Sequence, residues 1–135
     1  MKKIFVLFIL AFALITLFGC QAYVNSYVAT FMNTSSFGDE ASIEFDSFKG
    51  SYSLKLRRDG APESTLEIEA SLVEGEMNIY IGVDGEKELL LTLYGGESID
   101  KTVTLDKKYE NENTVYVILE ANEKCFDGDF EFEYN

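Results

Sequence analysis

Residues 66–83, LEIEASLVEGEMNIYIGV, decide the fold class. Apolar residues occupy alternate positions from Leu66 to Leu72 and again from Met77 to Val83. Alternation with a period of two sends one side chain into the core and the next into solvent, as in an antiparallel β-sheet. The break at Glu74-Gly75-Glu76 carries turn residues. The stretch therefore predicts two strands of an antiparallel sheet.

The same alternation recurs on both sides of this stretch. Further predicted strands lie at residues 43–46, 52–56, 89–93, 99–105, 115–119 and 130–134. The breaks between them are Lys49-Gly50, Asp59-Gly60-Ala61-Pro62, Asp84-Gly85-Glu86, Gly95-Gly96, Asn111-Glu112-Asn113 and Asp127-Gly128. Asp-Gly is a strong hairpin signal, because both residues tolerate positive φ. No convincing amphipathic helix interrupts the pattern, so it predicts an all-β fold, an antiparallel β-sandwich of about seven to nine strands.

The composition excludes several kinds of function. The chain has 135 residues, a formal net charge of −13, no histidine, no tryptophan and two cysteines. Such an acidic chain repels phosphate backbones, so we expect no nucleic-acid partner. A catalytic triad built on imidazole is impossible without histidine, and a zinc site would lack its usual ligands. No metal site and no catalytic residues are predicted.

The amino terminus predicts an export signal. Lys2 and Lys3 precede a fifteen-residue apolar stretch, residues 4–18, that is broken only by Thr16. This length suits a signal peptide and is short for a membrane span. The stretch ends in Leu17-Phe18-Gly19-Cys20, which resembles the lipobox of bacterial lipoproteins. The resemblance implies cleavage before Cys20 and lipidation of its thiol, although Phe18 is bulkier than the residue usual in its place.

Two other interpretations of this segment stay open, an ordinary secretory signal and an uncleaved anchor helix. The lipoprotein interpretation divides the chain into a signal peptide (residues 1–19), a tether and lead-in (20–40) and a β-sandwich domain (41–135). An early strand in the lead-in is one interpretation, and we expect the second half of the lead-in to pack on the domain. It predicts an extracytoplasmic protein that two acyl chains anchor to the cell membrane. The mature chain would have 116 residues and a net charge of −15, since Lys2 and Lys3 are lost.

Cys125 would then be the remaining thiol, so no internal disulfide can form. Its neighbour Lys124 favours a reactive thiolate, whereas its apolar setting favours a small buried hydrophobe. We favour the second interpretation.

Two segments of the mature chain carry a further resemblance. They are residues 74–85, EGEMNIYIGVDG, and the C-terminal residues 128–134, GDFEFEY, which follow the strand Val115-Tyr116-Val117-Ile118. Over residues 42–135 the chain resembles small uncharacterised β-sandwich lipoproteins of Gram-positive bacteria. Tyr134 stands where tryptophan is common, and Glu120-Ala121-Asn122 replaces the usual glycine. The resemblance implies the fold and the location, and it brings no activity.

Candidate sites in the sandwich are few. Calcium, which takes oxygen ligands alone, is the one metal that the loops suggest, at Asp84 to Glu88 and at Asp127 to Glu131. Neither loop has EF-hand spacing. The basic cluster Lys55 to Arg58 reads as the solvent-exposed side and end of a strand, partnered with neighbouring glutamates, or as a phosphate contact.

Three tyrosines form a candidate ligand-binding platform. Tyr80, Tyr94 and Tyr116 each lie at the position opposite in parity to the apolar set of their strand. Tyrosine offers a large apolar face with a polar tip, which suits sugars and peptides. The alternative is that these side chains pack across strands, since Leu90 and Ile118 share their parity.

Together these features predict a non-catalytic, lipid-anchored β-sandwich of the bacterial cell envelope, either a binding module or an accessory and structural one. It would contact an envelope ligand or a partner protein. One alternative is a small envelope hydrolase, which requires a deep cleft with two facing carboxylates. Another is an inhibitor or immunity-type lipoprotein, which would use an exposed sheet edge or an acidic patch.

Overall fold

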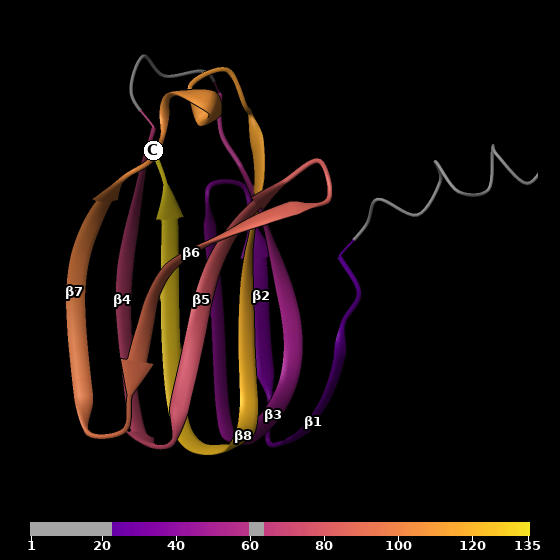
Figure 1. The fold of residues 1–135 in the computed structure, drawn as a ribbon, viewed down its shortest axis with the longest axis vertical. Helices are drawn as coiled ribbons and strands as arrows, with labels where there is room; N and C mark the ends of the chain where they lie inside the picture. Colours follow the sequence, from indigo (N-terminus) through magenta and orange to yellow (C-terminus); the bar gives the residue numbers. More distant parts are fainter. Residues whose placement is uncertain (1–22, 60–63) are drawn as a thin grey trace, which may run out of the picture.

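The fold is built from eight antiparallel strands that form one sheet (Figure 1). The structure, a computed structural model, describes residues 23–59 and 64–135. The strands are β1 (Ser26–Thr30), β2 (Asn33–Phe37), β3 (Glu40–Arg57), β4 (Thr65–Glu74), β5 (Glu76–Val83), β6 (Glu86–Tyr94), β7 (Glu97–Thr104) and β8 (Thr114–Tyr134). The helical content of this described part is the short 3-10 turn η1 (Lys107–Tyr109).

Two long strands, β3 and β8, run antiparallel along almost their whole length, from Glu40 opposite Glu133 to Arg57 opposite Thr114. On the free side of β8, β4 pairs with its C-terminal half and β5 with its N-terminal half. β7 and β6 extend β4 and β5 in the same way. On the free side of β3, β2 and β1 pair with successive segments. The sheet is therefore five bent strands wide.

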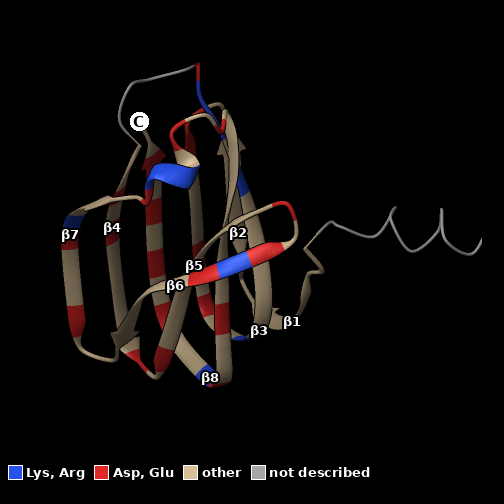
Figure 2. Cartoon of the chain, turned by 45° about the horizontal axis from the view of Figure 1, so that its top comes forward, with Lys and Arg blue, Asp and Glu red and all other residues tan. Residues whose placement is uncertain are grey.

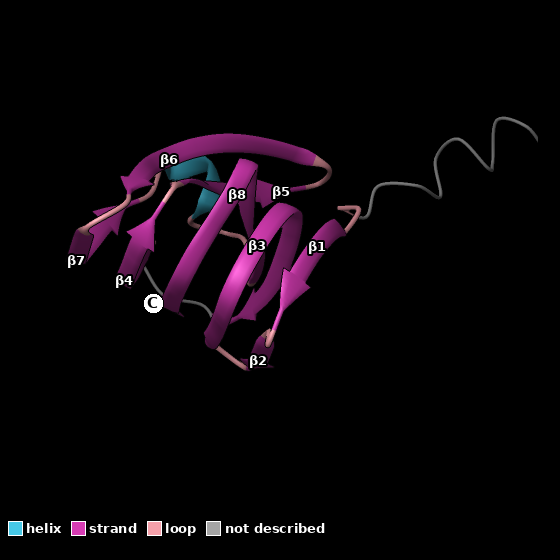
Figure 3. Ribbon diagram, turned by 90° about the horizontal axis from the view of Figure 1, so that it is seen from below, coloured by secondary structure: helices cyan, strands magenta, loops and turns pink. Residues whose placement is uncertain are grey.

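Every one of these bent strands turns over at the same level, so the sheet folds onto itself (Figures 1 and 3). The bend falls at Phe31, Gly50, Gly75 and Gly96, all of which have positive φ. On β8 it falls opposite Gly75, at Cys125. The first layer contains β2, β4, β7 and halves of β3 and β8. The second contains β5, β6 and the other halves, with β1 at its edge. This is the expected all-β sandwich.

The core lies between the two layers. Side chains on alternate positions point inward and are fully buried, among them Ile43, Phe45, Ile68, Met77, Ile79, Val117, Phe130 and Tyr134. Burying one such side chain contributes about 1.5–3 kcal/mol. The C-terminal strand therefore carries Phe130, Phe132 and Tyr134 into the core, as the alternation predicts.

The strands extend beyond those of the alternating pattern. Residues 26–37, in the lead-in where an early strand was one interpretation, lie in the sheet as β1 and β2, where they satisfy the hydrogen bonds of the free edge of β3. The predicted turns at Lys49-Gly50 and Asp127-Gly128 lie inside β3 and β8. Gly128 makes room for the Phe45 ring, since a Cβ there would lie 2.2 Å from Phe45 Cζ.

The end of the sandwich opposite the bend is closed by Arg58. The sequence pattern predicts a solvent-exposed strand end with glutamate partners for this residue, and that prediction is wrong. Arg58 is only 6% exposed. Its guanidinium donates hydrogen bonds to Ser64 Oγ and to the carbonyl oxygens of Tyr109, Glu110 and Asn135. These acceptors satisfy the buried charge.

The predicted signal peptide and its Cys20 lie outside the described residues. Among residues 23–59 and 64–135, no helix has the length and hydropathy needed to cross a membrane.

Cys125 is buried, and its Sγ donates to the Phe48 carbonyl oxygen at 3.2 Å. Burial raises the pKa of this thiol to about 11, which matches the interpretation of Cys125 as a small buried hydrophobe.

Candidate functional site: an acidic groove

The outer face of the first layer carries rows of directly opposed residues, nearly all of them polar. One row crosses β2, β3, β8, β4 and β7 as Phe37, Glu40, Glu133, Glu67 and Thr102. The next row is Ser35, Ser42, Glu131, Glu69 and Asp100. A third row holds Asn33, Glu44, Asp129, Ser71 and Ser98. At strand spacing the three rows cover about 19 Å by 13 Å.

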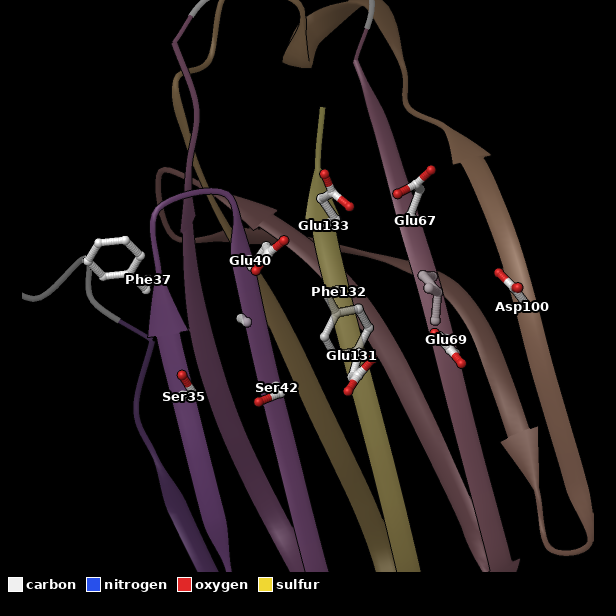
Figure 4. Close-up of a pocket in the computed structure, with 12 residues that line it drawn as sticks. Ser35, Phe37, Glu40, Ser42, Glu67, Glu69, Asp100, Glu131, Phe132 and Glu133 are labelled. Atoms are coloured by element: carbon white, nitrogen blue, oxygen red, sulfur yellow. The ribbon is translucent and has the colours of Figure 1, made fainter.

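This face is hollowed into a groove, which we call the acidic groove (Figure 4). Its first part has a volume of about 380 Å³, and six of its twelve lining residues are acidic: Glu40, Glu67, Glu69, Asp100, Glu131 and Glu133. A second hollow of about 360 Å³ shares Glu69, Asp100 and Glu131 with the first and extends it toward Ser71 and Ser98. No lysine or arginine lines either part of this described surface.

The carboxylates of the groove repel one another. Glu133 stands between Glu40 and Glu67 on the two neighbouring strands, and like charges in this position destabilise a sheet. The pKa of Glu133 is raised from 4.5, first by a hydrogen bond with Glu67 and then by partial burial and the charges of Glu67, Asp39 and Glu40. When protonated, Glu133 therefore donates to the Glu67 carboxylate. The carboxyl group of Glu133 therefore keeps its proton to a higher pH than an isolated glutamate does.

One aromatic residue stands at the margin of the groove. Phe37 ends the first row on β2, beside Glu40, and its side chain is 88% exposed. Figure 4 shows its ring at the side of the groove away from β4 and β7. An aromatic face next to carboxylates suits a ligand that carries both an apolar surface and a positive charge.

The two acidic loops that suggested calcium do not gather a cluster of metal ligands among the described residues. Among the described residues, no group of three or more acidic or cysteine side chains is close enough to hold a metal ion. Glu88 instead pairs with Lys108, whose Nζ lies 3.1 Å from its carboxylate. Asp84 and Asp127 both have φ near +50°. Aspartate tolerates this left-handed backbone conformation, so the backbone explains these aspartates without a metal ion. The carboxylates of the groove are spread across strands rather than converging on one point.

The three tyrosines lie on the outer face of the second layer, on the side opposite the acidic groove. Tyr80 and Tyr116 come from neighbouring strands and are offset by two residues, and both are half-buried. Tyr94 is 54% exposed and pairs with Glu76, four residues along β5 from Tyr80. That separation is about 13 Å. The structure thus brings Tyr80 and Tyr116 together and leaves Tyr94 near the bend.

Other side chains partly cover the tyrosine pair. The Tyr23 ring lies 5.1 Å from that of Tyr116, over Gly82, where a Cβ would lie 2.5 Å from the Tyr23 hydroxyl. Lys87 Nζ lies 4.6 Å from the centre of the Tyr80 ring and pairs with Glu120. Both features agree with packing across strands, and a ligand role for the tyrosines remains a prediction.

Sequence reasoning did not single out the acidic groove. The glutamates stood out only as the solvent-facing half of an alternating pattern, which describes most exposed strands. The missing information was the strand order, since β8 lies between β3 and β4. The signal that could have found the groove is the acidic alternation itself, Glu67 with Glu69 and Glu131 with Glu133, on two strands.

Comparisons with known proteins give only distant structural similarity. No family model and no curated protein matches the chain. A mutant family 29 carbohydrate-binding module matches with a TM-score of 0.47 and 15% identity, over 85% of this chain and 80% of that chain. A CBM4 structure matches with a TM-score of 0.43 and 13% identity, over 79% of this chain and 80% of that chain. CsCBM6-3 from Clostridium stercorarium, solved with cellobiose, matches with a TM-score of 0.41 and 13% identity, over 82% of this chain and 83% of that chain. These similarities are too distant to identify a ligand.

Proposed function

We propose that this chain is a lipid-anchored, non-catalytic binding module of the bacterial cell envelope, and that its acidic groove takes an extended ligand bearing positive charges. One observation carries the ligand class. The groove aligns six carboxylates from four strands, with no lysine or arginine among them. Carboxylates one strand spacing apart interact strongly, because that spacing is well inside the Debye length of about 8 Å. A polycation relieves this repulsion at several points at once.

The lipid anchor and the location rest on the sequence. The apolar stretch at residues 4–18 ends in the lipobox-like Leu17-Phe18-Gly19-Cys20. Metabolic labelling with a palmitate analogue should mark the wild-type protein and leave Cys20→Ala unmarked. Equal labelling of both proteins would refute lipidation at Cys20 without bearing on the groove.

The groove is tested with two matched probes. We expect isothermal titration calorimetry to detect binding of a glucosamine hexamer, which is polycationic, and none of the neutral N-acetylglucosamine hexamer. The affinity should fall as salt rises, since exposed charges are screened. Both probes share a sugar backbone, so equal binding would favour carbohydrate recognition without charge and contradict the proposed ligand class.

A triple variant assigns that binding to the groove. Replacing Glu69, Glu131 and Glu133 with glutamine should abolish binding of the glucosamine hexamer. The matched control replaces Glu76, Glu110 and Glu123, three exposed glutamates outside the groove, and removes the same net charge. If the control weakens binding equally, the probe responds to overall charge and the groove is not its site.

The hydrolase alternative meets a geometric obstacle. Its best carboxylate pair is Glu67 and Glu133, since the pKa of one of them is raised. Glycosidase carboxyl groups stand about 5–9.5 Å apart to admit the scissile bond and a nucleophile. The raised pKa of Glu133 comes first from a hydrogen bond with Glu67, its direct partner on β4, and a hydrogen-bonded contact is closer than that range. This pair therefore gives no support to the hydrolase alternative.

A second candidate function follows from the free edge of the sheet. Within residues 23–59 and 64–135, β1 and β2 pair only with β3, so each has one side unpaired in this part of the chain. An inhibitor-type lipoprotein would offer this edge to a strand of a partner protein.

A further inference from the structure

The edge formed by β1 and β2 differs in charge from the rest of the domain. Residues 21–38 contain no charged side chain, whereas all 24 acidic residues of the chain lie after residue 38. Figure 2 shows β1 and β2 without red or blue segments. The opposite edge carries Glu86, Lys87 and Glu88 on β6 and Asp100 and Lys101 on β7. Charges protect a sheet edge from unwanted contacts, and the described residues of the edge formed by β1 and β2 lack that protection.

The β1 edge also exposes apolar side chains. Val24 is 78% exposed, Val28 77% and Phe31 85%. Phe31 has a φ of 51°, a strained conformation for an aromatic residue, and it directs the chain from β1 into β2. We call Val24, Val28 and Phe31 the apolar edge.

The apolar edge is held in place by its neighbours. Ser53 donates two hydrogen bonds, from its backbone N and its Oγ, to Asn25 Oδ1 at 2.8 and 2.9 Å. The Tyr27 ring packs on the sheet, stacked on Phe48 at 5.9 Å and edge-on to Tyr52 at 5.2 Å, and remains 43% exposed. Val28, the next residue of the strand, points to the opposite face and away from these rings. The exposure of the apolar edge is thus imposed by the fold.

The position of the proposed lipid anchor indicates what covers the apolar edge. Only Gln21 and Ala22 separate Cys20 from Tyr23, the first described residue. Three residue steps span at most about 10 Å, so a lipid on Cys20 holds this part of the domain against the bilayer. Val24 lies only four residues from the anchor.

Charge favours the same partner. The anionic surface of a bacterial membrane repels a mature chain of net charge −15, and this repulsion is weaker at an edge without charged side chains. Lys49, which is exposed and pairs with Val28, adds a cation beside the apolar edge. Apolar side chains next to a lysine suit the interface between lipid headgroups and acyl chains.

We infer that the apolar edge lies in the membrane interface when Cys20 is lipidated, so that the domain is oriented on the bilayer by its β1 side. This inference rests on the lipid anchoring proposed above. It leaves the acidic groove, on the outer face of the first layer, free to meet ligands away from the β1 edge.

The absence of tryptophan from the chain allows a direct test. The full-length protein is expressed, processed and lipidated as Phe31→Trp, then reconstituted into vesicles of equimolar phosphatidylglycerol and phosphatidylethanolamine with brominated acyl chains. The matched control is Leu89→Trp, on the opposite edge strand β6, where the leucine is 52% exposed. Val28→Trp is a second reporter in case the Phe31 variant does not fold.

We expect the Phe31→Trp emission to shift to shorter wavelength and to be quenched by brominated lipid several-fold more than that of Leu89→Trp. Flotation of the same samples separates the two proposals. A protein that does not float has no anchor, and both proposals fail. If it floats with Phe31→Trp quenched no more than the control, membrane contact is refuted while the anchor stands. A third outcome uses vesicles without bromine and iodide as an aqueous quencher. If the tryptophan of Phe31→Trp becomes better protected from iodide as more protein is loaded per vesicle, the edge pairs with a second copy, and the inference is wrong.

Discussion

The guanidinium carbon of Arg58 lies 4.1 Å from the centre of the Tyr134 ring. The single Tyr134 hydroxyl hydrogen is shared between the carbonyl oxygens of Glu112, at 2.7 Å, and Tyr109, at 3.1 Å, and Arg58 also donates to the Tyr109 carbonyl oxygen. The two side chains therefore tie the end of β3 and the C-terminus to the segment that leads into β8. They close the open end of the sandwich, where the strands pair no further.

Arg58→Met should lower the free energy of unfolding by about 3 kcal/mol, because it removes charged hydrogen bonds and a cation–π contact. Arg58→Lys should recover only part of this, since an ammonium group cannot reproduce the guanidinium fork. The control is Arg57→Met at the exposed neighbouring position, which should stay within about 0.5 kcal/mol of wild type. Urea denaturation measures all three. Equal effects at Arg57 and Arg58 would refute the closing role.

Gly75→Ala should be one of the most damaging small substitutions in the domain. Gly75 has a φ of 106°, and a Cβ there would lie 2.5 Å from Cys125 Cβ and 2.8 Å from Cys125 Cα. Backbone strain and the clash together should cost more than about 3 kcal/mol. Gly96→Ala, at the same bend with a φ of 87° and no atom within 4 Å, should cost only about 1–2 kcal/mol. Melting temperatures that rank the two the other way would contradict this account of the bend.

Cys125 should be unreactive in the folded protein. Its pKa is raised to about 11, so the thiol is protonated at pH 8, and it is fully buried. We expect no reaction with Ellman's reagent until urea unfolds the domain, whereas a Val28→Cys variant should react at once at its exposed site. The unfolded thiol, with an ordinary pKa of 9.0, loses its proton first. Stability should therefore decline as the pH rises from about 9 to 11.

Glu133→Gln should separate stability from binding. It removes a charge opposed by Glu40 and Glu67, so the domain should gain about 0.5 kcal/mol. The same change should weaken binding of the glucosamine hexamer. Glu123→Gln, at an exposed position outside the groove, should change neither quantity measurably. A destabilised Glu133→Gln protein would show that the carboxylate has a structural role.

The pH dependence of the groove follows from the same carboxyl group. Because the folded pKa of Glu133 is raised above 4.5, the folded state keeps a proton that the unfolded state releases in the window above that value. Stability from this group is therefore present at the acidic end of the window and is lost as the pH rises through it. A cationic ligand must displace this proton, so calorimetric affinity for the glucosamine hexamer should fall as the pH falls through the window. Glu133→Gln should reduce this dependence, and an unchanged profile would exclude Glu133 as its source.

Local pattern was enough to predict the class of fold. The alternation in residues 66–72 and 130–134 fixes which side chains are buried, because a strand exposes every second side chain to the same face. Asp84-Gly85 was read correctly as the turn between β5 and β6, since its conformation depends on those residues alone. Predictions of this kind depend only on residues that are close together in the sequence.

The acidic groove was decided by the tertiary structure. Glu40, Glu67 and Glu133 are far apart in the sequence and become neighbours only because β8 lies between β3 and β4. Gly128 reads as a turn residue, yet it lies within β8, where the Phe45 ring takes the space its side chain would fill. Arg58 reads as exposed, yet the arrival of the C-terminus buries it. The physical reason is common to these cases: strand order and the bend arise from contacts between distant segments, whereas periodicity records only which face a residue occupies.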